Sequence, residues 1–309
     1  MKKSIGLAIM ICVFITFACA KGENAKAKNK IVDEGAYPVF VTIQPLASIA
    51  ESLAGEYATV HVILDPGTDP HTYEPLPEDI LRLANSAMLF HIGMGFDDWA
   101  SKIALEAEDG PRIYPVSMGV PMLPAVPDNS LDRLREENLM PTKGNPHVWL
   151  DPKIVADIII PTMARAFASA DPPNSEFYMV NAQRLQKHIS SLADSISIAL
   201  ESHKGESVIL HHGSFAYFCR RFKLDAVEVI QPFPGMETSP ANLIKIIENA
   251  KKENAVAILS EPLVSQKIAQ AVAEELGIPI ISVDPLGKSG EGYIELMKRN
   301  TNEIIDGLE

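Results

Sequence analysis

Two blocks of short apolar, β-branched runs alternate with amphipathic stretches, and this alternation limits the folds that the chain can adopt. The runs lie at residues 37–43, 58–65, 87–93 and 112–117 in the first block and at 206–212, 224–230, 255–261 and 278–284 in the second. Apolar runs alternate with helical patterns in this way when parallel strands are buried between helices on both faces. The sequence therefore predicts an α/β protein with two lobes.

A long helical stretch separates the two blocks. Residues 175–205 read "SEFYMVNAQRLQKHISSLADSISIALESHKG", with a serine at the start and apolar residues at helical spacing. At ~1.5 Å per residue such a helix is about 45 Å long and can run along both lobes. We expect an N-terminal lobe over 37–172, a linking helix over 174–204 and a C-terminal lobe over 205–309.

The N-terminus is typical of an export signal. Lys2 and Lys3 precede an apolar stretch that ends at Ala18, and it is too short to span a membrane. We expect residues 1–18 to be the signal peptide and 19–36 a flexible tether. Either Cys19 carries a lipid, the alternative that we favour, or cleavage follows Ala20. In both cases the mature protein works outside the cytoplasm, in the periplasm or on the outer face of the membrane.

Charge and cysteine content exclude several other classes of protein. The formal net charge is −13 and becomes −15 without the two lysines of the signal. No basic stripe is present to neutralise phosphates, so we expect no nucleic-acid partner. Cys219 is the one cysteine beyond the signal region, which excludes a disulfide framework within the fold. We expect a monomer whose contact with the membrane is through a lipid on Cys19.

Four candidate metal ligands lie in loops or at the ends of predicted strands. They are His71, His147, His212 and Asp284, and each is close to a proline or a glycine. Ligands of parallel α/β sheets bind beyond the carboxyl ends of the strands. Since each lobe supplies two of the four residues, we expect a shared site between the lobes. Their spacing of about seventy residues forms no short metal motif.

Four motifs add a resemblance to a known family. "DPHTYEP", "NPHVWLDP", "HGSFAYFCRRFKL" and "EPLVSQKIAQAVAEELGIPIISVDPLG" occur in this order. Together they resemble the solute-binding proteins of bacterial zinc and manganese ABC importers, over nearly the whole mature chain. The resemblance implies two four-stranded α/β lobes bridged by a rigid helix, an ABC permease as partner, and metal binding without catalysis. It also implies that His71, His147, His212 and Asp284 are the ligands.

The donor set favours Zn²⁺ as the transported ion. Three imidazoles and one carboxylate suit tetrahedral zinc, and four protein ligands leave no open position for an activated water. In the family, members that carry manganese usually have glutamate in place of His212, although some members with three histidines take Mn²⁺ or Fe²⁺. The loop at 121–146 lacks the histidines that many zinc members carry there. Mn²⁺ or Fe²⁺ transport, a zinc-dependent hydrolase and a surface adhesin lipoprotein are the alternatives.

The histidine pair at 211–212 supplies one ligand. Adjacent residues of a strand point to opposite sides, so His211 and His212 cannot both reach one ion. Periodicity alone does not say which of them faces the cleft. In the family the ligand stands five residues ahead of a Tyr-Phe pair, and this resemblance selects His212. His211 then either has a structural role or supports a ligand from behind, and Glu261 is either a carboxylate that orients a ligand or a structural residue.

Overall fold

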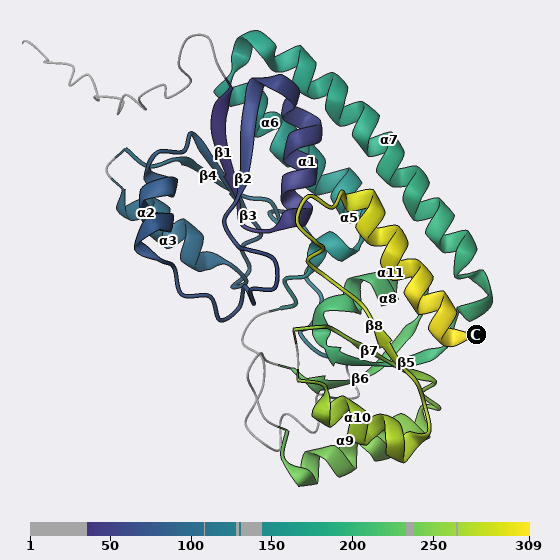
Figure 1. Ribbon diagram of the computed structural model, residues 1–309. Helices are drawn as coiled ribbons and strands as arrows, with labels where there is room; N and C mark the ends of the chain where they lie inside the picture. The colour runs from purple at the N-terminus through teal and green to yellow at the C-terminus, as the bar shows by residue number, and fades with distance from the viewer. Residues whose placement is uncertain (1–35, 108, 128–129, 131–143, 233–237, 264) are drawn as a thin grey trace, which may run out of the picture.

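Two parallel sheets form the framework of the molecule. A computed structural model describes residues 36–107, 109–127, 130, 144–232, 238–263 and 265–309. The signal peptide and residues 19–35 of the tether, including Cys19, lie outside the described residues. The chain forms two four-stranded parallel sheets with the strand orders β2-β1-β3-β4 and β6-β5-β7-β8. The predicted two-lobed α/β fold is confirmed, and the two sheets have the same connectivity (Figure 1).

The N-terminal lobe alternates strands and helices as expected. Its elements are β1 (Tyr37–Val41), α1 (Gln44–Ala54), β2 (Ala58–Val62), α2 (Pro77–Ala84), β3 (Met88–His91), α3 (Asp98–Glu106) and β4 (Arg112–Pro115). Pro45 lies in the first turn of α1, and Gly55, at φ 54°, follows its last residue. Glycine reaches this positive φ without strain, so the chain can leave the helix there and turn into β2.

Helices then connect the lobes. Three short segments, η2 (Val148–Leu150), α5 (Pro152–Ile154) and the π-helix η3 (Val155–Ile159), lead into α6 (Ile160–Ala170) and α7 (Ser175–Ala199). Pro161 lacks the N–H that an α-helix needs, and the wider π turn lies immediately before it. Helix α7 runs along the flank of both lobes and α11 lies beside it (Figure 1).

The C-terminal lobe repeats the alternation. Its elements are β5 (Ser207–His212), α8 (Ala216–Phe222), β6 (Asp225–Gln231), α9 (Pro240–Lys252), β7 (Ala257–Ser260), α10 (Gln266–Leu276), β8 (Ile280–Ser282) and α11 (Tyr293–Leu308). Within the described ranges no helix combines the length and the apolarity needed to cross a membrane.

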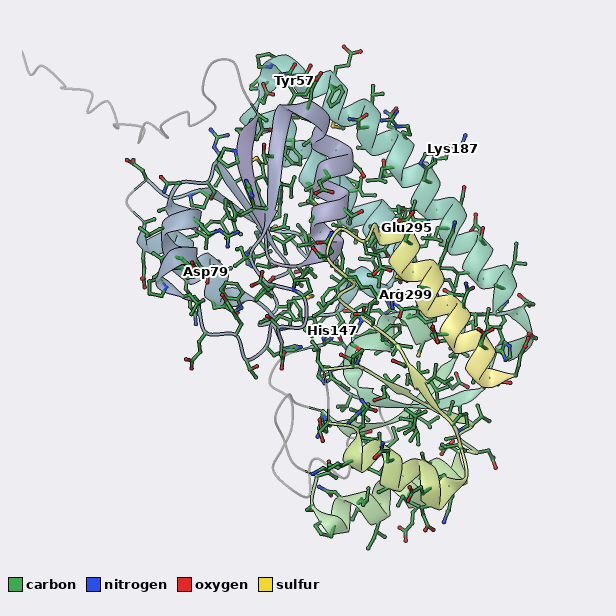
Figure 2. All side chains as sticks on the ribbon, viewed as in Figure 1. Tyr57, Asp79, His147, Lys187, Glu295 and Arg299 are labelled. Atoms are coloured by element: carbon green, nitrogen blue, oxygen red, sulfur yellow. The ribbon has the colours of Figure 1, made fainter. Side chains whose placement is uncertain are left out.

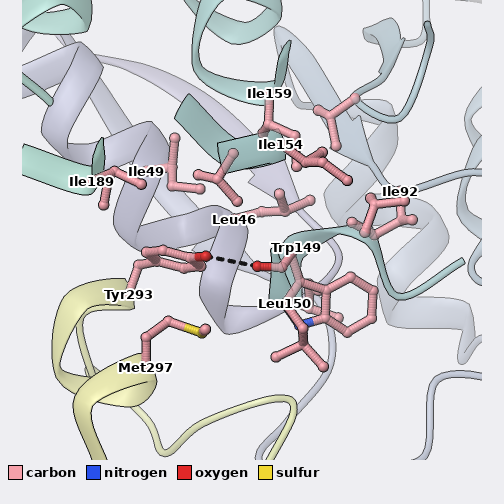
Figure 3. Packing of buried hydrophobic residues seen from close by; sticks show 14 of the residues in the cluster. Leu46, Ile49, Ile92, Trp149, Leu150, Ile154, Ile159, Ile189, Tyr293 and Met297 are labelled. Atoms are coloured by element: carbon pink, nitrogen blue, oxygen red, sulfur yellow. Dashed lines mark hydrogen bonds between the residues drawn. The ribbon is translucent and has the colours of Figure 1, made fainter. Parts of the chain in front are cut away.

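Alternate strand residues enter different hydrophobic clusters. On β5, Val208 and Leu210 belong to one large cluster, whereas Ile209 packs under α9 and α10 on the opposite face. On β1, Val39 joins the same large cluster, whereas Phe40 packs under α2 and α3. The large cluster therefore contacts the inner faces of both sheets, and part of it, around Trp149 and Tyr293, is drawn in Figure 3. Each sheet is buried on both faces, as its apolar strands require.

Candidate metal centre

Three histidines reach one place from distant parts of the chain. His71 lies in the loop after β2, His147 comes directly before η2, and His212 is the last residue of β5. Their imidazoles form a nearly equilateral triangle, with ring centroids 5.2 Å apart for 71–147, 5.3 Å for 71–212 and 5.1 Å for 147–212. One nitrogen of each ring lies within 4.8 Å of the other two. In Figure 2, His147 marks this place between the lobes.

The spacing of the nitrogens suits a tetrahedral ion. The Nε2 atoms of His71 and His147 are 3.2 Å apart. Two nitrogens bound at about 2.0–2.1 Å to one tetrahedral zinc would be about 3.3 Å apart. The Nε2 atom of His212 is buried and has no hydrogen-bond partner in the part of the chain that the structure describes. A buried polar atom without a partner needs an explanation, and an ion at the centre of the triangle supplies one.

Hydrogen bonds of the other ring nitrogen, Nδ1, determine which nitrogen of His147 and of His212 carries the proton. His147 Nδ1 is 2.9 Å from Asn145 Oδ1, and Asn145 Nδ2 donates to the Gly213 carbonyl at 2.6 Å. His212 Nδ1 is 3.1 Å from the carbonyl oxygen of Gln231. Both acceptors are oxygens, so Nδ1 must be the donor in each ring and the Nε2 lone pair is directed into the triangle. Such outer contacts fix the tautomer and ring orientation of metal-binding histidines.

The site favours neutral imidazoles, the form that binds metal. Burial, together with repulsion from His212, lowers the pKa of His71 to about 4. Burial also lowers the pKa of His147 well below its usual range, with repulsion from His212 and His71 acting in the same direction. At neutral pH these two rings therefore have free lone pairs and do not repel a cation.

Asp284 lies outside this nitrogen cluster. Its Oδ1 accepts hydrogen bonds from the amides of Leu286, at 3.0 Å, and Gly287, at 2.9 Å. Its Oδ2 is 2.9 Å from Nη2 of Arg299. The structure thus brings together three of the four predicted ligands and holds the fourth carboxylate in other contacts, so the ligand role of Asp284 stays a prediction.

Two residues beside the cluster have structural contacts. His211 is fully buried and points to the other face of β5, where its Nδ1 lies 2.7 Å from Ser260 Oγ. The buried Glu261 accepts a hydrogen bond from the Ser214 hydroxyl. Burial raises the pKa of Glu261. The side chains of His211 and Glu261 thus form hydrogen bonds to serines, and both also interact electrostatically with His212.

A second group of potential metal ligands lies in the N-terminal lobe, and its central carboxylate already accepts several hydrogen bonds. His91, Asp97 and Asp98 lie close together at the end of β3. Asp97 accepts hydrogen bonds from the Thr42 hydroxyl and from the amides of Ile92 and Gly93. These donors tie β3 to the start of α3, so we interpret this group as structural.

Asn145 and Arg299 contact candidate ligands, His147 and Asp284 respectively, and sequence reasoning did not predict either contact. An asparagine two residues ahead of a histidine is a usable signal, because such side chains bond to the backbone two residues on, as Asn145 does to the His147 amide at 3.0 Å. No comparable signal exists for Arg299. It lies on the last helix and meets Asp284 only in the folded molecule.

Two α/β lobes of equal topology, bridged by a helix and with converging imidazoles between them, define a solute-binding protein for metal ions. Residues 39–307 match the sequence model of the ZnuA family, described as zinc-uptake complex component A, periplasmic, and the chain belongs to this family. Members of this group are exported substrate-binding components of metal ABC transporters and not enzymes. The resemblance noted in the sequence is confirmed.

Relatives match over the whole length of the chain. The metal ABC transporter substrate-binding lipoprotein FimA of Streptococcus parasanguinis is 25% identical over 324 residues, covering 100% of this chain and 99% of the relative. The iron ABC transporter substrate-binding lipoprotein MtsA of Streptococcus pyogenes serotype M6 is 27% identical and covers 99% and 98%. A crystal structure of ZnuA has a TM-score of 0.76 at 25% identity, covering 89% of this chain and all of that chain. The FpvC protein of P. aeruginosa with Ni²⁺ has a TM-score of 0.75 at 25% identity, covering 88% and 97%.

Proposed function

We propose that this protein captures Zn²⁺ between its lobes and delivers it to the permease of an ABC importer. The convergence of three imidazole nitrogens, two of them with the tautomer set by Asn145 and Gln231, is the observation that carries the proposal. His71, His147 and His212 supply the nitrogens, and Asp284 supplies the fourth ligand after turning from Arg299.

The donor atoms of the site favour zinc. Imidazole nitrogen suits zinc, whereas manganese prefers oxygen donors. A 3.2 Å separation between two Nε2 atoms also matches the short tetrahedral edge of a zinc site. Relatives are named for manganese and for iron, and a solved relative is described with Ni²⁺. Mn²⁺ and Fe²⁺ are therefore the competing ions that an experiment must include.

The proposed function also requires the protein to be located outside the cytoplasm, close to its permease. We propose that a lipid on Cys19 holds it at the outer face of the membrane as a monomer, with the acidic surface facing solvent. Lipid-modified relatives such as FimA support this setting. Mass spectrometry of the protein purified from membranes tests the anchor, because cleavage after Ala20 would leave no N-terminal cysteine to carry the lipid.

Metal binding is tested on the exported protein after removal of metal with a chelator. Titration with Zn²⁺ in competition with a chromophoric chelator should give one ion per chain, and Mn²⁺ and Fe²⁺ should bind more weakly. His147→Ala and His212→Ala should each weaken zinc binding by about 100-fold or more, because each removes a ligand. His188→Ala, an exposed histidine on α7, is the matched control and should bind as the natural protein does.

The variants distinguish the rival assignments. If His212→Ala leaves zinc affinity unchanged, the proposed site is wrong. If Mn²⁺ or Fe²⁺ outcompetes Zn²⁺ but the histidine variants lose binding, the site is right and the ion is wrong.

A further inference from the structure

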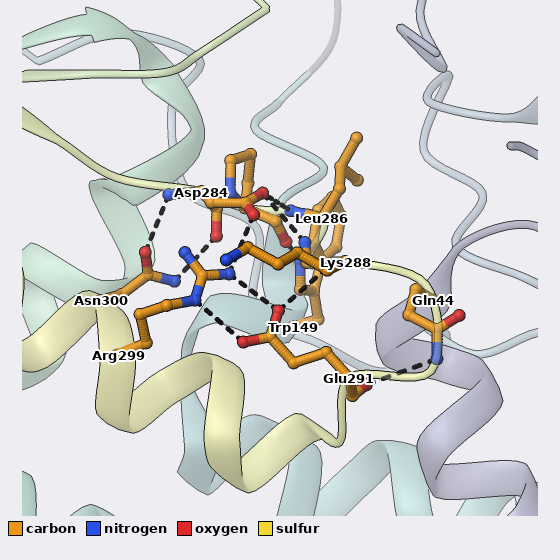
Figure 4. A network of polar contacts seen from close by, with 10 residues as sticks. Gln44, Trp149, Asp284, Leu286, Lys288, Glu291, Arg299 and Asn300 are labelled. Atoms are coloured by element: carbon orange, nitrogen blue, oxygen red, sulfur yellow. Dashed lines mark hydrogen bonds and ion pairs between the residues drawn. The ribbon is translucent and has the colours of Figure 1, made fainter. Parts of the chain in front are cut away.

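Arg299 on α11 contacts two carboxylates at once. Its Nη2 lies 2.9 Å from Oδ2 of Asp284 and 2.8 Å from Oε2 of Glu291, and its Nε lies 2.9 Å from Oε1 of Glu291 (Figure 4). The ion pair between Arg299 and Glu291 is bidentate, whereas the ion pair between Arg299 and Asp284 uses one nitrogen. Two parallel hydrogen bonds hold a guanidinium more firmly than one. Arg299 is thus anchored by Glu291 and reaches Asp284 from there.

Glu291 itself is fixed by the surrounding backbone. Its Oε2 accepts the Lys288 amide at 2.9 Å, and its own carbonyl accepts Nε2 of Gln44, on α1 of the other lobe, at 3.3 Å. Arg299 therefore keeps a placed, charged partner when Asp284 moves. The guanidinium of Arg299 can therefore stay in place when the carboxylate of Asp284 turns away from it.

The main chain of Asp284 is also fixed. Its amide donates to Oδ1 of Asn300 at 2.8 Å, and its carbonyl accepts from Nδ2 of Asn300 at 2.7 Å. The backbone is clamped from both sides, so the carboxylate can move only by rotation of the side chain, which also loosens the hydrogen bonds that Oδ1 accepts from the amides of Leu286 and Gly287. Oδ2 of Asp284 is paired with Arg299, and this contact must break for that oxygen to reach an ion.

We propose that Arg299 competes with the metal ion for Asp284 and thereby sets the affinity and the release rate of the site. The inference rests on the proposed function, since it takes the three histidines and Asp284 as the ligands. A cation that binds Asp284 has to displace a second cation that is already paired with it. Binding is then weaker than the four ligands alone would give, and the carboxylate has a partner to return to when the ion leaves. A receptor that must hand on its cargo needs both properties.

The test is a pair of substitutions with opposite expected effects. Arg299→Met retains the aliphatic part of the side chain and removes the charge, so Zn²⁺ should bind about two- to fivefold more tightly, as expected for loss of one partly exposed ion pair, and should dissociate more slowly. Glu291→Gln leaves Arg299 with Asp284 as its one charged partner, so Zn²⁺ should bind more weakly. Lys298→Met removes the same charge from the adjacent, exposed position and should change neither value.

A double substitution separates competition from general damage. In an Asp284→Asn background the competing ion pair is gone, so adding Arg299→Met should no longer tighten zinc binding. The full chain is exported, stripped with chelator and titrated with Zn²⁺ in each form, and thermal unfolding reports whether each variant is folded. If Arg299→Met does not fold, Glu291→Gln and its combination with Asp284→Asn carry the test alone.

The outcomes also separate this inference from the proposed function. If Zn²⁺ binding depends on His147 and His212 but Arg299→Met weakens it or leaves it unchanged, Arg299 does not compete for Asp284 and the inference is wrong. The same holds if Arg299→Met tightens binding equally with and without Asp284. If the histidine substitutions have no effect on zinc affinity, the proposed function itself fails.

Discussion

Acidification should destabilise the metal-free protein through the buried histidines. The pKa of His71 is about 4 in the folded chain and about 6.5 in an unfolded one. Between these values the unfolded state binds a proton that the native state excludes. The contribution of His71 to the free energy of unfolding is therefore complete above pH 6.5 and is lost as the pH falls toward 4.

The size of this loss follows from the same two pKa values. The linkage relation gives a loss of about 1.4 kcal/mol at pH 5.5 and about 2.5 kcal/mol at pH 4.5. The full difference of about 2.5 pKa units corresponds to roughly 3 kcal/mol, a large part of the stability of an ordinary domain. His147 should add to the loss, since its pKa is lowered as well.

Urea unfolding followed by tryptophan fluorescence measures this effect, because Trp149 is completely buried. We would compare the chelator-treated natural protein with His71→Gln, which has no titrating ring at that position, at pH 7.5, 6.5, 5.5 and 4.5. The difference in unfolding free energy between the two should fall by about 2.5 kcal/mol across this range. His188→Gln controls for loss of a histidine as such. If the natural protein and His71→Gln lose stability in parallel, the pKa of His71 is not depressed and the reasoning is refuted.

Three substitutions near the site should have separable effects. Trp149→Phe removes the indole donor to the Pro285 carbonyl, 2.7 Å away, and should cost about 1–3 kcal/mol of stability by urea unfolding, because a buried acceptor loses its partner. Asn145→Ala releases Nδ1 of His147 and should weaken zinc binding by about 10- to 100-fold in a chelator competition. Gly213→Ala places a Cβ 2.9 Å from a backbone oxygen and 3.4 Å from the amide of Asn145, so it should lower both the thermal midpoint and the zinc affinity.

The expectations for Trp149→Phe and Asn145→Ala can each be contradicted by a specific result. Trp99→Phe breaks a longer bond, 3.3 Å to Pro70, in a half-buried place, and should cost less than Trp149→Phe. Equal losses would mean that packing, not the hydrogen bond, decides the result. Unchanged zinc affinity in Asn145→Ala would mean that His147 keeps its orientation without that contact.

The elements of the fold could be predicted because their signals are local. Each strand is an apolar β-branched run, and the run at 206–212 shows the alternation that sends His211 and His212 to opposite faces. Helix α7 could be predicted because its apolar spacing continues without interruption over Ser175–Ala199. The π turn at Val155–Ile159 was not predicted, because a proline inside a helical pattern is compatible with several local adjustments.

The site was less accessible to sequence reasoning than the fold. The convergence of His71, His147 and His212 depends on segments from both lobes, and only the family motifs selected His212 over its neighbour. The pairing of Asp284 with Arg299 depends on where the last helix packs, which no local pattern encodes. A carboxylate looks the same in sequence whether it faces an ion or an arginine.

The shared hydrophobic cluster makes the two lobes one cooperative unit. The inner faces of both sheets and the side of Ile189 on α7 belong to the same buried cluster. Opening one lobe would expose apolar surface of the other, so the sheets should melt in a single calorimetric transition. Amide hydrogens on β1 and β5 should exchange with solvent at similarly slow rates, set by global unfolding. A gene fragment that encodes either lobe alone should yield an insoluble product, although each lobe has a complete sheet.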